Sequence, residues 1–135
     1  MRFDLRVVIT GVGVISPSGL GVSVLWKSIV EGKSAARKVE GFDASKFPTT
    51  FACEIQGYKA EDHFSSKEIK RMDKFVQVAL VAAKEAIADS GIDVAAGKED
   101  PDRIGVIIGS GIGGIDTLEK EARALDLSAE HPKVS

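Results

Sequence analysis

The chain of 135 residues has a formal net charge of -2 at pH 7, with 44% hydrophobic and 28% charged residues. This length is sufficient for one domain with a hydrophobic core, and the near-neutral charge gives no general attraction to nucleic acid or anionic lipid. The single cysteine excludes an internal disulfide, and Cys53, His63 and His131 are too widely spaced to suggest a zinc site without carboxylate ligands.

The N-terminal segment does not have the pattern of a secretory leader. The apolar run from Val7 to Ile15 is short and is interrupted by Gly11 and Gly13, whereas a leader needs a longer apolar run followed by small residues at a cleavage site. No stretch reaches the length of a membrane span. We therefore expect a cytoplasmic protein that binds neither nucleic acid nor membrane.

The first third of the chain predicts a strand followed by a helix. Arg6–Thr10 is β-branched and almost continuously apolar, which is typical of a strand buried on both faces in a parallel sheet. A glycine-rich stretch follows, and apolar residues then recur at helical spacing from Val22 to Val30, with Gly32 as a natural stop. Further on, Phe51–Ile55 is compatible with a short strand.

The best-marked helix is predicted to begin at Ser65. Ser65 and Glu68 fit the capping box S-x-x-E, in which each side chain bonds the free backbone N–H of the other residue. Apolar residues continue along one face from Met72 to Ile87, and Gly91 ends the helix.

The last third repeats the order of strand and helix. A polar loop over residues 93–102 leads to Arg103–Gly109, a second strand of the buried type. Glycines follow, and a helix is predicted from about Ile115 to Leu127. This alternation favours an α/β fold, with residues 1–135 in one domain.

Gly109–Gly114 matches the pattern G-x-G-x-x-G after a strand and before a helix. In a dinucleotide-binding protein such a turn holds a pyrophosphate on the backbone N–H groups at the start of the helix. That fold also needs a second strand ending in an acidic residue, and residues 124–135 show no strand pattern. We favour a tight structural turn that lets the backbone pack closely.

Basic residues gather on one side of the helix predicted from Ser65. At 100° per residue they share a sector opposite the apolar face. The basic residues of this sector are Lys67, Lys70, Arg71 and Lys74. They are either a solvated helix face or a landing site for an acidic partner, in which charge steers the encounter. The residues alone leave both interpretations open, because Glu68 and Asp73 lie beside them.

No nucleophile or catalytic base is predicted among the cysteine and the histidines. Cys53 falls in the predicted short strand, beside Glu54, and is interpreted as a small buried residue because no cation or helix start accompanies it. His63 and His131 lie in polar surroundings and are interpreted as surface residues.

Four segments, in the same order, resemble the β-ketoacyl-acyl carrier protein synthases of the type II class. They are VVITGVGVISPSGLGVSVLWKSIVEGKS, GFDASKFPTTFACEI, SSKEIKRMDKFVQVALVAAKEAIADSGID and PDRIGVIIGSGIGGIDTLEKE. The resemblance runs from about Arg6 to about Glu121, and its R-M-D and G-S-G-I-G-G forms are most similar to the elongating enzymes of fatty acid synthesis. It implies a thiolase-like α/β fold with five α-β-α-β-α layers in a homodimer, of which this chain holds part of the first half.

The resemblance also implies an activity. The enzymes are acyltransferases that condense an acyl-enzyme with malonyl-acyl carrier protein in a decarboxylating Claisen condensation, without a cofactor or metal. In relatives a cysteine takes the acyl group and two histidines assist the condensation, all in later segments that this chain does not contain. We therefore expect the chain alone to lack the catalytic residues and to be inactive, and its two strands to lack neighbours.

Several residues match positions with roles in relatives. Ile112 matches the isoleucine beside the fatty acyl chain, so Gly109–Gly114 becomes a structural turn that lines the acyl pocket. In relatives, positions that match Lys67, Lys70 and Arg71 dock the acidic acyl carrier protein. Lys74 is added only because it is predicted to lie on the same helix face. Two alternatives remain: a dinucleotide-binding module that uses Gly109–Gly114, and a non-catalytic domain that binds the carrier through its basic residues.

Overall fold

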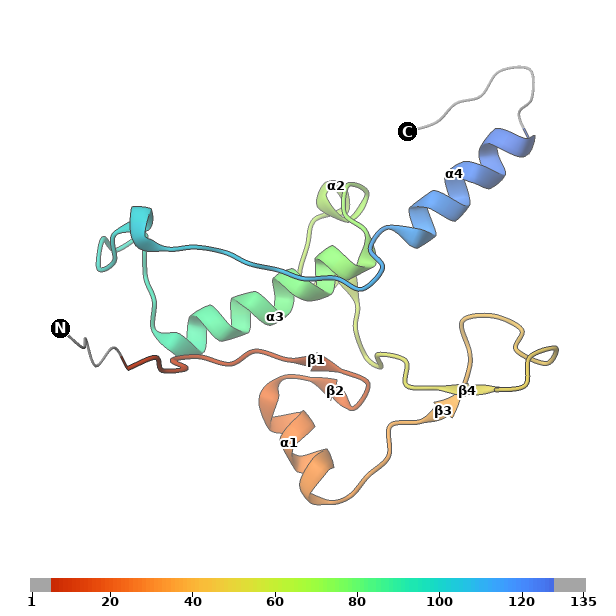
Figure 1. Ribbon diagram of the computed structural model, residues 1–135, viewed down its shortest axis with the longest axis horizontal. Helices are drawn as coiled ribbons and strands as arrows, with labels where there is room; N and C mark the ends of the chain where they lie inside the picture. The colour runs from red at the N-terminus through yellow and green to blue at the C-terminus, as the bar shows by residue number, and fades with distance from the viewer. Residues whose placement is uncertain (1–5, 128–135) are drawn as a thin grey trace. The chain divides into compact units, whose positions relative to one another are not determined.

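The computed structural model describes residues 6–127, which divide into two compact units. The first contains residues 6–59 and 81–104, and the second contains residues 60–80 and 105–127. Helix α3, Lys74–Ser90, contributes residues to both units. Figure 1 labels the elements along the chain. Between residues 6 and 127, no helix is both long and apolar enough to cross a membrane.

The first unit begins with a two-residue hairpin that leads into a helix. Strand β1, Ile15–Ser16, pairs antiparallel with β2, Gly19–Leu20. Helix α1 follows at Val22–Val30, and Gly32 adopts a φ of 63° two residues after its end. The predicted helix and its glycine stop are thus confirmed, since a left-handed backbone after a helix is most easily adopted by glycine.

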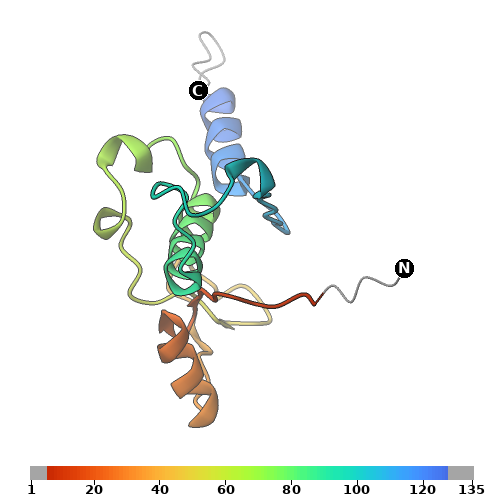
Figure 2. The ribbon, with the colours of Figure 1, turned by 90° about the vertical axis from the view of Figure 1, so that its left-hand side faces the viewer.

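The segment before the hairpin lies directly on helix α3 of the same unit. A side chain on Gly11 would overlap the carbonyl oxygen of Ala86, and one on Gly13 would overlap that of Ala82. Figures 1 and 2 show this segment, in red, reaching the later part of α3. The glycines of T-G-x-G therefore allow two backbones to approach more closely than any side chain permits.

Two carboxylates of α3 bond the backbone of this segment. Glu85 accepts the N–H of Val14 at 2.8 Å and the N–H of Val22 at 3.0 Å. Asp89 accepts the N–H of Val12 at 2.9 Å. Val22 is the first residue of α1, so Glu85 also places a negative charge at a helix N-terminus, where the free N–H groups favour it.

A second pair of short antiparallel strands in the first unit encloses a loop. Strand β3, Arg37–Lys38, pairs antiparallel with β4, Phe51–Ala52, which confirms a short strand at the start of the predicted segment. Between them the rings of Phe42 and Phe47 meet edge to face, with centroids 5.6 Å apart. The backbone N–H and the side chain of Ser45 bond the Asp43 carboxylate and hold its pKa below the usual value.

The second unit contains a 3-10 turn and the helices α2 and α4. A 3-10 turn, η1, covers Ala60–Asp62, and α2 covers Ser66–Ile69. Helix α4, Ile115–Leu127, has the predicted bounds. In the first unit a second 3-10 turn, η2, covers Pro101–Arg103, within and just after the predicted loop.

The two predicted buried strands do not form. Residues 6–10 and 104–109 have no partner strand among the described residues, and Arg103 belongs to η2. Val7 is 96% exposed and Ile107 is 100% exposed. The prediction was wrong because a strand requires a neighbour for its N–H and C=O groups, and no described segment supplies one.

The predicted continuous helix from Ser65 is also wrong, because it is interrupted between α2 and α3. The N–H groups of Val76 and Gln77 both bond the carbonyl of Asp73, at 3.0 and 3.1 Å. The side-chain amide of Gln77, only 7% exposed, donates to the carbonyl of Met72 at 2.8 Å. In an unbroken helix that carbonyl would accept the N–H of Val76 instead.

We expect Gly13→Ala to lower the free energy of unfolding by about 3 kcal/mol, because the added methyl group forces two backbones apart. Urea unfolding of the purified protein measures the change. Gly105→Ala is the matched control, since no atom lies within 4 Å of its added methyl group and its φ is not in the left-handed region. Equal effects of both substitutions would contradict the close approach at Gly13.

Candidate functional site

The basic residues predicted to dock a partner lie within the short helix α2 and directly after it. The capping box is confirmed: Glu68 accepts the N–H of Ser65 at 2.8 Å, and the hydroxyl of Ser65 accepts the N–H of Glu68. The Glu68 carboxylate is therefore turned toward Ser65. Lys67, Lys70 and Arg71 are exposed, and none of the carboxylates whose side chains the structure describes lies within 4.0 Å of their charged nitrogens.

Lys74 does not share a helix sector with these three residues. It is the first residue of α3, after the interruption at residues 70–73. The single-helix geometry that grouped it with Lys67 is therefore wrong. Its side chain is exposed and lines a different pocket from the one that Lys70 and Arg71 line.

Asp73 joins the basic segment to helix α4 within the second unit. Its carboxylate accepts a hydrogen bond from the hydroxyl of Thr117, on the first turn of α4. Gly114, with a φ of 72°, lies so close that a Cβ there would be 3.1 Å from the other oxygen of Asp73. The end of the R-M-D motif and the start of α4 are therefore held together by one aspartate.

The glycine turn before α4 packs against the first turn of α3. A Cβ on Gly113 would lie 2.7 Å from the Phe75 ring, so the ring occupies the space of a side chain at this position. This packing gives one glycine of the G-x-G-x-x-G pattern a structural reason. Around Gly109 and Gly111, by contrast, no atom would lie within 4 Å of an added Cβ.

Ile112 lies at the turn and lines a small pocket. The pocket has a volume of about 150 Å³ and is also lined by Phe75 and Ile115. Ile112 is 74% exposed, so one side of its side chain faces the pocket and much of the rest is uncovered. The lining is mixed. Its apolar part is suited to an alkyl group, and the rest comes from Asp73, Lys74, Gly114 and Asp116.

Cys53 and His63 belong to different compact units. Cys53 is exposed and lies just after β4, so the prediction that it is buried within a strand was wrong. His63 is half-buried beside the Phe64 ring, with ring centroids 6.3 Å apart. His131 lies outside the described residues. Among the side chains that the structure describes, no group of three or more histidine, cysteine, aspartate or glutamate residues could hold a metal ion.

Comparison with known families identifies the chain. A family model described as "Beta-ketoacyl synthase, N-terminal domain" matches residues 4–134. The chain belongs to the β-ketoacyl synthase family. The resemblance predicted from four sequence segments is thereby confirmed.

Two similar curated proteins, from two different bacteria, have the same name. The chain is 42% identical over 119 residues to the 3-oxoacyl-[acyl-carrier-protein] synthase 2 of Staphylococcus aureus strain MRSA252. It is 42% identical over 120 residues to the protein of that name from Vibrio cholerae. These alignments cover 88% and 89% of this chain but only 28% of each relative.

A solved structure supports the fold class. The chain is similar to the ishigamide ketosynthase/chain length factor, with a TM-score of 0.70 and 27% sequence identity. The match covers 93% of this chain and 30% of the other. The prediction of a thiolase-like α/β fold, of which this synthase chain holds a part, is confirmed.

Three residues that organise this region were given no role in the sequence analysis. Gln77 bonds the Met72 carbonyl at the helix interruption, and Thr117 bonds Asp73 across 44 residues of sequence. Lys120 lines the same pocket as Lys70 and Arg71. Gln77 belongs to the family segment R-M-D-x-F-x-Q, and this was the one sequence signal that could have indicated its role. The positions of Thr117 and Lys120 depend on tertiary structure, which no local pattern indicates.

We expect Thr117→Val to lower the free energy of unfolding by about 1 kcal/mol, because it removes the hydroxyl that bonds the Asp73 carboxylate. Valine keeps the branched shape, so helix propensity changes little. Hydrogen exchange at the Leu118 amide, in the same helical turn, should accelerate. Thr117→Ser retains the hydroxyl and serves as the control; an identical effect of serine and valine would contradict the role of the bond.

Proposed function

We propose that this chain is the N-terminal portion, residues 1–135, of a 3-oxoacyl-acyl carrier protein synthase of fatty acid elongation. The observation that carries the proposal is the 42% identity, over 88% of the chain, to 3-oxoacyl-[acyl-carrier-protein] synthase 2 of Staphylococcus aureus. The complete protein acts in the cytoplasm as a homodimer, as the resemblance implies.

The proposed reaction is a decarboxylating Claisen condensation. An acyl group held as a thioester on a cysteine is attacked by the carbon that malonyl-acyl carrier protein exposes when it loses CO₂. The new carbon–carbon bond gives 3-oxoacyl-acyl carrier protein, and the cysteine leaves as the thiolate. Cys53 and His63 are not assigned to these steps, because they match none of the catalytic segments of the family.

This portion of the synthase contributes to carrier docking. Lys67, Lys70 and Arg71 are exposed and are not paired with a carboxylate among the described residues. Acyl carrier protein is acidic, so these side chains favour its approach by long-range attraction and hold it by short charge pairs. Because the described part of the chain supplies no carboxylate partner for them, these cations are available to the carrier.

The turn at Gly109–Gly114 contributes to the acyl pocket. Ile112 and Phe75 line a common pocket, and an apolar side chain at its wall limits the length of acyl chain by filling volume. We do not propose dinucleotide binding, because the turn packs closely on Phe75 at Gly113 and the chain belongs to the synthase family.

The condensation assay tests the proposal as a whole. The full-length protein that contains this chain should convert an acyl primer and malonyl-acyl carrier protein to the 3-oxoacyl product and CO₂. The 135-residue chain alone should give no product. Condensation by the chain alone would overturn the assignment of chemistry to later segments, and carrier binding without condensation by the full-length protein would favour a non-catalytic carrier-binding domain.

Lys70→Glu should weaken binding of acyl carrier protein about fivefold or more, because it replaces an attraction with a repulsion at the docking face. Titration of the full-length protein with carrier protein, at two salt concentrations, measures both the affinity and its salt dependence. Lys98→Glu makes the same change of net charge at an exposed site outside the docking residues, and should change affinity less than twofold.

Ile112→Phe should reduce the rate with long acyl primers about tenfold or more relative to short primers, because the larger ring fills acyl-pocket volume. Competition between primers of different lengths in one assay gives the ratio directly. Ile112→Val removes one methylene and should not disfavour long primers. A uniform loss of rate at every length with Ile112→Phe would contradict a role in length selection.

A further inference from the structure

A pocket with a cationic rim lies within the second unit and is not explained by the docking residues alone. It has a volume of about 450 Å³. Its lining comes from the segment after α2 and from one face of α4. The lining residues are Ile69, Lys70, Arg71, Met72, Asp73, Thr117 and Lys120.

The two walls of this pocket are fixed to each other by specific contacts. Thr117 donates its hydroxyl proton to the Asp73 carboxylate, and Gly114 lies against the same carboxylate. Lys120 is three residues beyond Thr117 and therefore lies on the same face of α4. The hydrogen bond thus holds Lys120 on the side of the helix where Lys70 and Arg71 stand.

The charge of the pocket is predominantly positive. Lys70, Arg71 and Lys120 contribute three cations, whereas Asp73 is the one carboxylate in the lining and is engaged by Thr117. Of the carboxylates described, none lies within 4.0 Å of the charged groups of these three basic residues.

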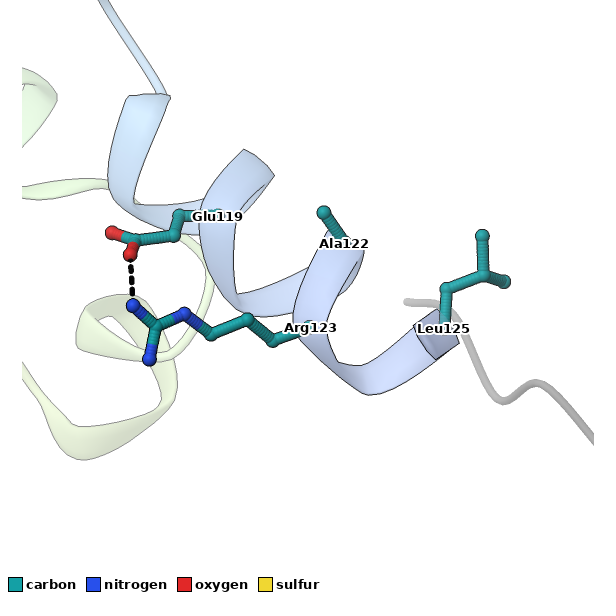
Figure 3. Close-up of a pocket in the computed structure, with 4 residues that line it drawn as sticks. All are labelled: Glu119, Ala122, Arg123 and Leu125. Atoms are coloured by element: carbon teal, nitrogen blue, oxygen red, sulfur yellow. Dashed lines mark hydrogen bonds and ion pairs between the residues drawn. The ribbon is translucent and has the colours of Figure 1, made fainter. Parts of the chain in front are cut away.

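Asp116 and Glu121 lie four residues before and one residue after Lys120 on α4 and lower the local positive potential, whereas Glu119 does not pair with Lys120. Glu119 is paired instead with Arg123 at 2.5 Å, one turn along the helix, as Figure 3 shows. Lys120 is exposed, so its ammonium group is accessible to a partner in solution. An exposed cation beside two others is a favourable place for an acidic group, since each charge lowers the free energy of the same anion.

We infer that Lys120 is a further docking residue, and that the pocket formed by Lys70, Arg71 and Lys120 receives carboxylate side chains from the acidic surface of the carrier protein. The inference rests on the proposed function and extends the docking face from α2 onto α4. Thr117 and Asp73 act as positioning residues, because they hold the helix that carries Lys120. The pocket provides a concave binding surface for carboxylate side chains. Lys67 is not among its lining residues and attracts the acidic carrier protein from outside the pocket.

The test is a charge-reversal series in the full-length protein that contains this chain, with apo acyl carrier protein as the probe. The apo form lacks the phosphate-bearing prosthetic group, so only the protein surface of the carrier contributes. Lys120→Glu should weaken binding about fivefold or more, and Lys120→Ala should weaken it by a smaller factor. Lys98→Glu, equal in charge change and outside the pocket, should change the affinity less than twofold. Far-UV circular dichroism checks that α4 is retained in each variant.

The outcomes separate this inference from the proposed function. If Lys70→Glu weakens carrier binding but both Lys120 variants bind as well as Lys98→Glu does, the inference is overturned and the proposed docking face stands. If Lys70→Glu has no effect on carrier binding, the docking proposal itself is wrong. If inorganic phosphate displaces the apo carrier more strongly than chloride does at equal ionic strength, the pocket is a phosphate site and its assignment to carboxylates is wrong.

Discussion

The carboxylate of Glu85 joins helix α3 to the two ends of a hairpin that lie 71 and 63 residues earlier in the sequence. It stands on α3 and accepts N–H groups from both ends of the first hairpin, at Val14 and Val22. The bonds are possible only because Gly11 and Gly13 let the preceding backbone lie against the same helix. The placement of the hairpin and the start of α1 therefore depends on one ionised side chain and on two positions without side chains. A charged acceptor is well suited to this role, since each of its hydrogen bonds is stronger than one between neutral groups.

Asp73 has a comparable position in the second unit. Its backbone carbonyl accepts the N–H groups of Val76 and Gln77 at the start of α3, while its carboxylate accepts the hydroxyl of Thr117. One residue thus ends the basic segment, begins a long helix and anchors the next helix after the glycine turn. This arrangement places Lys70, Arg71 and Ile112 in the same unit, so one set of contacts positions the residues proposed to bind the carrier protein and the acyl chain.

The sequence predicted those features that depend on neighbours along the chain. The capping box at Ser65, the bounds of α1 and α4, and the glycine after α3 all follow from local patterns and are present. The interruption before Lys74 was missed because the apolar period continues through it, while the Gln77 amide bonds the Met72 carbonyl. The two apolar strands were predicted from composition alone, and pairing is decided by segments distant in sequence. The pocket that contains Lys120 likewise depends on a contact across 44 residues, which no local pattern encodes.

The apolar stretch Ile104–Ile108 has a consequence for handling the protein. It is β-branched apart from its glycine, lacks proline, and exposes Ile107 completely and Val106 to 81%. In such a stretch the unpaired backbone groups and the apolar side chains are available to identical copies of the chain. Pairing of identical apolar segments in this way is the basis of cross-β stacking. Asp102 and Arg103 stand immediately before it and act as charged gatekeepers, since stacking in register would bring like charges together. These two charged residues therefore oppose the association of this stretch with identical copies.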